Sequence, residues 1–250
     1  MLLKVLSLLL ARRGWMFLLL LAGFAGPAAA EETPAGGEVK WSGSAELGIV
    51  LTSGNTESRS TTGKFKFLNQ RVDWRHRLHA DGYKATDKGT VTAENYKLEG
   101  RSEYLLREID YLFGLLRYEY DPFAGYERRT TEVAGYGYDV LKRKTLTWKV
   151  EAGVGARQTL SGSGENTREG LWRLATWLKW DTGKNSSFTQ GLFIEQGGEN
   201  RFTESSSELK IKLNASLACK LALSVKHNSE VPVDKKNTDT KTTVTLNYDF

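Results

Sequence analysis

The stretch His227-Asn228-Ser229 is the part of the sequence that most resembles a catalytic arrangement. Residues two apart in an extended strand share one face, so the histidine could take a proton from the serine hydroxyl. Such a base needs an acid or amide within hydrogen-bond reach to orient it. The neighbouring positions predicted for that face hold only hydroxyl side chains: Thr238, Thr240, Thr242, Ser205 and Ser207. The pattern therefore favours a polar pair over a catalytic one.

Other site chemistry has little support in the sequence. The three histidines are His76, His79 and His227, and no acidic cluster stands at metal-ligand spacing around them. There is no phosphate-binding glycine loop, no CxxC and no helical zinc motif. Cys219 is the single cysteine and cannot form an internal disulfide, so we interpret it as a small half-buried residue near a turn. We predict no metal and no cofactor.

Charged residues at alternate positions carry more information. They include Lys64, Lys66, Glu99, Arg101, Glu103, Lys149, Glu151, Arg157, Lys179, Glu195, Glu208, Lys210, Lys212 and Lys226. Isolated buried charges are costly, so these side chains need water or close partners of opposite sign. A solvated sheet face meets this need, and the lumen of a barrel is such a face rolled up.

The elements that would hold these residues are strands. From Trp41 to Phe250 apolar and polar residues alternate in about twelve segments of roughly ten residues, with turn signals between them and no helical period. The connections alternate between short and long, and the long ones include polar loops from about Lys84 to Ala93 and over residues 161–169 and 197–204. This alternation is typical of a membrane barrel with tight periplasmic turns and longer outer loops. We predict an all-β, antiparallel, up-and-down transmembrane barrel with both termini in the periplasm.

The last nine residues, TTVTLNYDF, support this prediction. Val244, Leu246, Tyr248 and Phe250 form an apolar row that ends in a free C-terminal phenylalanine. Soluble domains usually end in polar, frayed residues. The ending resembles the C-terminal strand of bacterial outer-membrane barrels, which implies that Leu246, Tyr248 and Phe250 act as a signal for the barrel-assembly machinery.

Aromatic residues give an internal test of the orientation. Trp41, Trp74 and Trp148 begin odd-numbered strands, whereas Trp180 and the Tyr248–Phe250 pair end even-numbered ones. All of them would then gather at the periplasmic end of the outer face, as an aromatic girdle at the membrane interface requires. A soluble periplasmic β-protein, the remaining alternative for the fold, has no reason to collect its tryptophans at one height.

The N-terminus predicts export. Residues 1–30 contain a basic start, an apolar core about ten residues long and the small-residue run Ala28–Ala30, which together form a secretory signal peptide of the Sec type. Residues 31–40 read as a flexible periplasmic leader. The signal holds three basic and no acidic residues, so cleavage would bring the net charge from +5 to +2. Because this net charge is small, we predict no nucleic-acid partner. The signal peptide and the predicted barrel together predict a location in the bacterial outer membrane, among its lipids and lipopolysaccharide.

Three segments carry a resemblance to a known family: LTSGNTESRSTTGKFKF, YEYDPFAGYERR followed by GYGYDV, and KKNTDTKTTVTLNYDF. They resemble the YdiY-like family of salt-induced outer-membrane proteins (domain-of-unknown-function family 481), and the resemblance covers roughly residues 41–250. It implies a secreted outer-membrane β-barrel of a Gram-negative bacterium. It brings no activity and no catalytic residues.

We expect a structural or stress-related role or narrow-channel transport, without catalysis. A barrel of about 8 strands is filled by side chains and one of about 16–18 leaves a wide channel, so with twelve strands the inward side chains decide. Their length and mixed charge predict a lumen that is not an open pore. The alternative is a lipid-modifying barrel enzyme of the phospholipase or lipid A deacylase type. Those enzymes have a catalytic His-x-Ser pair, and His227 and Ser229 resemble it.

Overall fold

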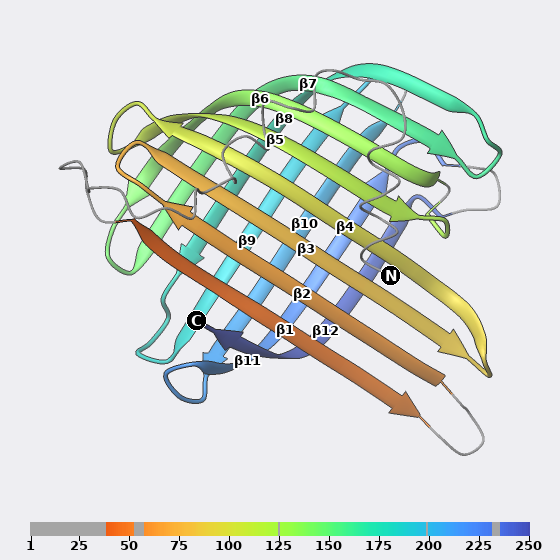
Figure 1. The fold of residues 1–250 in the computed structure, drawn as a ribbon, viewed down its shortest axis with the longest axis horizontal. Coiled ribbons are helices and arrows are strands. Elements are labelled where there is room, and N and C mark those ends of the chain that lie inside the picture. Colours follow the sequence, from red (N-terminus) through yellow and green to blue (C-terminus); the bar gives the residue numbers. More distant parts are fainter. Residues whose placement is uncertain (1–38, 53–57, 125, 199, 232–235) are drawn as a thin grey trace, which may run out of the picture. The chain divides into compact units, whose positions relative to one another are not determined.

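The computed structural model describes residues 39–52, 58–124, 126–198, 200–231 and 236–250. Its twelve strands form one closed antiparallel barrel, in which each strand pairs with the next and β12 returns to β1 (Figure 1). The strands are β1 (Lys40–Thr52), β2 (Ser58–Gln70), β3 (Trp74–Asp87), β4 (Thr90–Leu105), β5 (Asp110–Asp121), β6 (Tyr126–Lys142), β7 (Leu146–Ser161), β8 (Asn166–Trp180), β9 (Ser186–Gln196), β10 (Arg201–Lys212), β11 (Leu217–Asn228) and β12 (Thr238–Asp249). The predicted all-β up-and-down barrel of twelve strands is confirmed. The predicted signal peptide and residues 31–38 of the leader lie outside the described residues.

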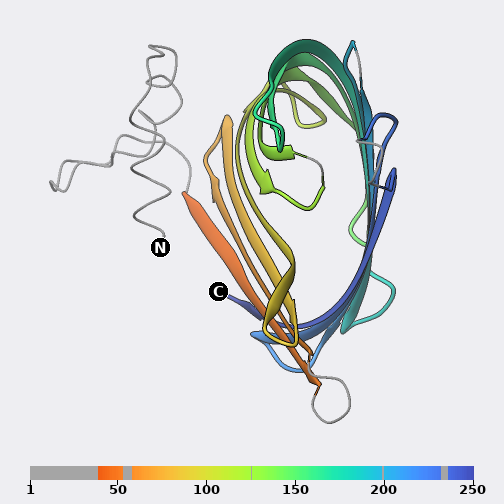
Figure 2. The same ribbon diagram turned by 90° about the vertical axis from the view of Figure 1, so that its right-hand side faces the viewer.

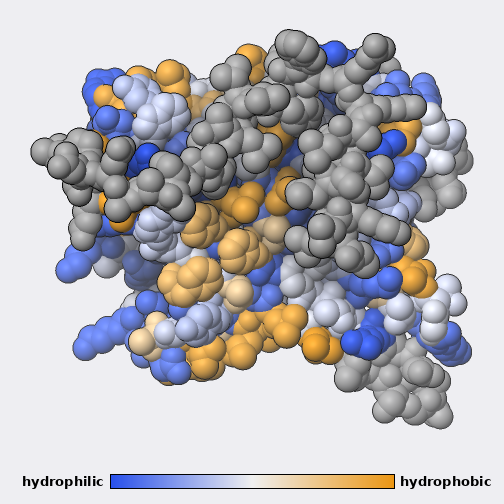
Figure 3. Space-filling model, viewed as in Figure 1, coloured by the Kyte–Doolittle hydropathy of each residue, from blue (hydrophilic) through white to orange (hydrophobic). Residues whose placement is uncertain are grey.

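The two faces of the wall have opposite character. Large apolar side chains are exposed on the outside, as at Val154 (68 % exposed) and Leu246 (53 %), whereas charged side chains such as Glu103 and Arg117 are buried inside. Apolar residues gather on the outer surface over β1 to β3 (Figure 3). This distribution is the reverse of that in a water-soluble protein and matches a barrel with a lipid-facing exterior and a polar interior. No helix among the described residues is long and apolar enough to cross a membrane.

Strand ends differ from the sequence prediction at the barrel end away from the termini. A polar loop was expected from about Lys84 to Ala93, but β3 and β4 continue to a two-residue turn at Lys88 and Gly89. Both turn residues have positive φ (47° and 80°), the combination that suits a tight hairpin. β8 and β10 likewise begin inside segments expected to be loops, 161–169 and 197–204. The expected alternation of short turns with long loops is therefore wrong for these hairpins.

The barrel is flattened rather than round. Viewed from the side, β1–β4 form one wall and β9–β12 the other, and β5–β8 curve between them (Figure 2). Ion pairs cross the interior: Arg117 of β5 contacts Glu195 of β9 at 2.6 Å, and Lys66 of β2 lies 4.0 Å from Glu208 of β10. Opposite walls are thus within reach of each other's long side chains.

The seam between the first and last strands is short. β1 pairs with β12 only from Ser44↔Asp249 to Leu47↔Leu246, whereas it pairs with β2 along its whole length. Mutual backbone hydrogen bonds of 2.9 and 3.0 Å between Gly43 and Phe250 extend the seam at the terminal end. Beyond Leu47 the two strands diverge (Figure 1). We call the end of the barrel that carries this terminal residue the Phe250 end.

Candidate functional site: the barrel lumen

One part of the lumen is filled by apolar side chains from β5. Alternation along β5 turns Tyr111, Phe113 and Leu115 inward, where they pack with Val133 of β6 and Leu171 of β8 in one buried cluster. The inner face of the neighbouring strand β6 makes room for the rings, because glycines stand opposite them. Phe113 pairs with Gly135 and Tyr111 with Gly137. A Cβ at either glycine would collide with the facing ring.

Beside this cluster, an ion-pair group joins β3, β4 and β7. Arg101 binds both oxygens of the Glu151 carboxylate, with one N–O distance of 3.1 Å. Glu103, completely buried, accepts from Arg101 at 2.7 Å and also forms ion pairs with Arg75 and Arg77. The Tyr111 hydroxyl donates to Glu151 at 2.7 Å, which ties the charged group to the apolar cluster. Each buried carboxylate therefore has a cationic partner, as burial in a low-dielectric interior requires.

A second group connects the curved part of the barrel to the wall formed by β9–β12. Glu195 of β9 accepts from Arg117 of β5 at 2.6 Å and from Arg173 of β8, and Arg117 also binds Glu119 at 3.1 Å. Both guanidinium groups lie over the ring of Phe193, at 5.3 and 4.0 Å from its centroid. Glu195 is 0 % exposed and Arg117 2 %. Water is thus excluded from this part of the lumen.

The lumen is less tightly packed along β3. Its inward side chains from Arg75 to Ala85 are only half-buried, whereas those of β5 are buried from Tyr111 to Glu119. Lys97 and Asp81 face each other at 3.6 Å, and Lys241 of β12 lies 4.0 Å from the ring centroid of Tyr83 on β3. The lumen is therefore closed beside β5 and keeps partial access for solvent along β3.

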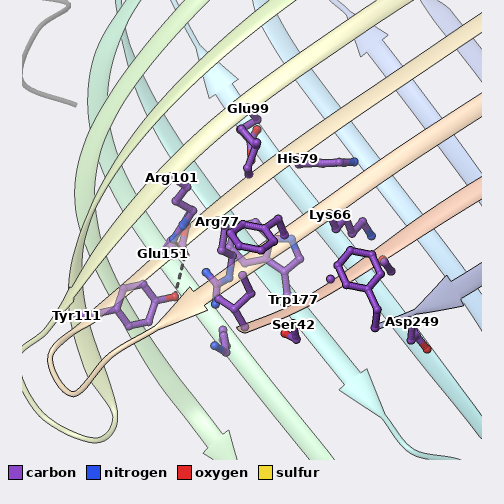
Figure 4. A pocket seen from close by; sticks show the side chains of 17 residues that line it. Ser42, Lys66, Arg77, His79, Glu99, Arg101, Tyr111, Glu151, Trp177 and Asp249 are labelled. Carbon is purple, nitrogen blue, oxygen red and sulfur yellow. Dashed lines mark hydrogen bonds and ion pairs between the residues drawn. The ribbon is translucent and has the colours of Figure 1, made fainter. Parts of the chain in front are cut away.

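A cavity of about 660 Å³ opens in the lumen near the Phe250 end. Figure 4 shows Arg101, Glu151 and Tyr111 together on one side of it and Lys66 and Asp249 on the other. Its charged and aromatic lining is made by Lys66, Arg77, His79, Glu99, Arg101, Tyr111, Lys149, Glu151, Trp177 and Asp249, among others. Apart from His79, four cationic side chains and three carboxylates belong to this lining. The cavity is thus polar, of a size for a small solute, and adjoins the ion-pair group.

The charged residues predicted from alternation lie in this lumen. Arg101, Glu103 and Glu151 meet in one group, while Glu208 binds Lys220 and Lys210 binds Asp249, at 2.7 and 2.6 Å. Glu99 and Lys149 line the cavity described above, and Lys212 ends β10. The prediction missed several partners: Arg117, Glu119, Arg173, Lys220 and Glu46. Arg117 and Glu119 stand in a strand that is apolar on both faces, so the pattern gave no inward face, although their spacing of two was a usable signal.

The predicted aromatic residues lie on the outer face at the Phe250 end. Trp41 packs on Phe67 and Trp74 on Tyr104, each with ring centroids 5.1 Å apart. Phe250 stacks with Tyr248 and Phe65. Exposed side chains complete the set: Trp41, Trp74, Trp148, Trp180, Leu246, Tyr248 and Phe250. The geometry suits an interfacial girdle, and the role of the terminal residues in assembly stays a prediction.

His227 and Ser229 do not bind each other. The His227 Nδ1 atom pairs with the Thr238 hydroxyl at 2.9 Å. The Ser229 hydroxyl accepts from the Arg201 amide at 2.9 Å and donates to the Asn200 side chain at 3.3 Å. Within the described ranges, no three His, Cys, Asp or Glu residues could hold a metal ion. His227 and Ser229 thus have separate hydrogen-bond partners.

Known structures share this fold. The NanC porin has a TM-score of 0.51 to this barrel at 11 % identity, covering 85 % of this chain and 99 % of that one. An outer membrane channel from Pseudomonas putida F1 has a TM-score of 0.48 at 14 % identity, covering 90 % and 98 %. The likeness to NanC shows that the chain has the fold of an outer-membrane porin.

The sequence has a relative as well. The uncharacterized protein YdiY of Escherichia coli (strain K12) is 29 % identical over 220 residues, which are 87 % of this chain and 86 % of that protein. Residues 45–250 match the family model described as "Protein of unknown function, DUF481". That match spans nearly the whole barrel and agrees with the resemblance seen in the sequence, so the chain belongs to the DUF481 family.

Proposed function

We propose that this protein is a narrow outer-membrane channel for small polar solutes and that it has no catalytic activity. The observation that carries the proposal is the buried contact of Arg117 of β5 with Glu195 of β9, because it crosses the lumen and narrows the space that is left for passage. In this proposal the Phe250 end faces the periplasm, with the exposed tryptophans at the inner membrane interface.

Two further features support a channel over an enzyme. Half-buried charges such as Asp81, Lys97 and Lys241 suit a hydrated path, since they keep contact with water. The separate hydrogen bonds of His227 and Ser229 favour a structural role for the pair that resembles a lipid-hydrolysing site.

Single-channel recordings in planar bilayers test the proposal. The wild type should give small conductance steps, and the variant Arg117→Ser/Glu195→Ser should give clearly larger ones, because the contact across the lumen is lost. Lys84→Ser/Glu94→Ser is the matched control, since it removes a partly exposed ion pair and should leave the conductance unchanged. Folding of each variant is checked by its heat-modifiable gel mobility.

Two results would contradict the proposal. Large, stable, general-porin conductance of the wild type would mean that the lumen is open. Absence of conductance in both the wild type and the folded double variant would mean that the barrel is not a channel.

A further inference from the structure

A second cavity, of about 590 Å³, lies in the lumen at the Phe250 end. We call it the lysine vestibule. Seven lysines and four carboxylates line it: Lys66, Lys144, Lys179, Lys184, Lys210, Lys212, Lys220, Glu46, Asp181, Glu208 and Asp249. Its lining is therefore strongly positive, although the chain as a whole carries a formal net charge of only +5. A surplus of one sign inside a concave, low-dielectric wall concentrates ions of the other sign.

Lysines already neutralise the four carboxylates. Lys220 binds both Glu46 and Glu208 at 2.7 Å, and Lys66 stands 4.0 Å from Glu208. At the rim, two further pairs form within the same lining: Lys210 with Asp249 at 2.6 Å, and Lys179 with Asp181 at 3.8 Å. No acidic group of the lining is left over for the other lysines.

Three lysines form no ion pair among the described residues: Lys144, Lys184 and Lys212. Each comes from a different element. Lys144 lies in the turn after β6, Lys184 in the turn after β8, and Lys212 at the end of β10. Because one cavity brings the three together, their charges act on the same volume. An isolated exposed lysine needs no partner, but three around one cavity offer a site to an anion with several charges.

We propose that the lysine vestibule binds small multivalent anions, compounds with two or more carboxylate or phosphate groups. An ammonium group acts as a point charge toward either kind of oxygen. Hydroxyl and amide groups in the same lining, at Ser187, Thr189 and Asn247, add hydrogen-bond donors. The volume falls in the range of pockets for small molecules, about 300–1,000 Å³.

The position of the vestibule gives this binding a role in passage. Lys66 and Asp249 belong both to the vestibule and to the 660 Å³ cavity, so the two cavities adjoin. Arg77, Arg101 and Lys149 then continue the cationic lining into the lumen. This inference rests on the proposed function, since it names the class of solute that the channel would take, but binding itself does not require conduction.

The test is isothermal titration calorimetry of the full-length protein in detergent, at low salt, with citrate and with inorganic pyrophosphate as probes. Both should bind, and binding should weaken as salt is added, because screening acts on groups in contact with water. Lys144→Gln/Lys184→Gln/Lys212→Gln should weaken it at least about tenfold, since three unit charges leave one site. Lys84→Gln/Lys88→Gln/Lys236→Gln changes the net charge equally at the opposite end and should leave binding unchanged.

The outcomes separate this inference from the proposed function. Absence of citrate and pyrophosphate binding, or equal weakening in both triple variants, would overturn the vestibule site, as would binding of only a long acidic peptide. If the anions bind as expected but the barrel does not conduct, the anion-binding site is supported and the proposed channel function is contradicted. The barrel could also conduct without binding anions and show, by its reversal potential in a salt gradient, no preference for anions. That result would support the channel function and contradict the anion-binding site.

Discussion

At the scale of single residues, the lumen depends on carboxylates that are shared between several cations. Glu195 and Glu103 are both 0 % exposed, and each has at least two arginine partners. Removing such a shared anion leaves buried guanidinium groups close together with too little negative charge. Without Glu195, for example, Arg173 loses its ion-pair partner and Arg117 keeps Glu119. Removing a surface charge leaves no buried, unpaired charge, because water replaces the lost partner.

Glu195→Ala should therefore lower the free energy of unfolding by about 3–5 kcal/mol, the range for breaking a buried ion pair. Urea unfolding of the barrel in lipid vesicles, followed by tryptophan fluorescence, measures it. Glu165→Ala removes a carboxylate of the same size that is exposed in the turn between β7 and β8, and should change stability by less than about 1 kcal/mol. Equal effects of the two substitutions would show that the buried ion pairs of Glu195 contribute no more to the free energy of unfolding than an exposed carboxylate does.

Phe250 should matter for assembly. Its backbone bonds to Gly43 and its ring stacks with Phe65 and Tyr248 at the outer surface. Deleting Phe250 should reduce the amount of folded barrel in the outer membrane and leave degraded material in the periplasm, whereas Phe250→Tyr keeps an aromatic end and should assemble. Heat-modifiable gel bands of membrane fractions measure this. Undiminished folded barrel after the deletion would contradict the prediction.

At the scale of elements, the sequence predicted the membrane-facing part of each strand and missed where strands continue beyond it. Lipid on one side and charge on the other impose alternation on segments such as Trp74–Asp81. Above the membrane both faces of a hairpin meet water, so the 84–93 segment keeps its backbone ladder without an alternating pattern. β5 could not be oriented because both its faces are apolar, and only its pairing with the glycines of β6 decides which face turns inward.

The β3–β4 turn offers a test at this scale. Gly89 has φ of 80°, in the region that side chains with a branched Cβ avoid. Gly89→Val should lower the unfolding free energy by about 1–2 kcal/mol. Lys88→Asn, at a position with φ of 47°, introduces a residue that accepts this conformation and should preserve or raise stability. A Gly89→Val barrel as stable as the wild type would argue against the tight turn.

At the scale of the whole molecule, the partners of the lumen charges could not be predicted from the sequence. Alternation indicates that Glu151 and Glu208 face inward, but it does not give the curvature that brings β4 to β7 or β2 to β10. The flattened section of the barrel sets these distances. Barrel shape depends on strand number and stagger together, and the stagger arises only when the sheet closes.

Export is also a property of the whole chain. We expect protein extracted from the outer membrane to begin at Glu31, because Ala28–Ala30 precede it as a small-residue cleavage site. N-terminal sequencing of the detergent-extracted barrel checks this. A first residue of Met1 would mean that the segment is retained.

The short seam has a consequence for the order of folding. Ser44 and Asp249 are separated by almost the whole chain, and their strands gain only four residue pairs when they meet. Joining distant segments carries a large loop-closure entropy, while the hairpins between consecutive strands form locally and pair over longer stretches. The barrel should therefore close last at β1 and β12, and the same strands should separate first. Hydrogen exchange in lipid vesicles measures this as earlier loss of protection at Leu47 and Leu246 than along β6 and β7, and a uniform loss around the barrel would contradict it.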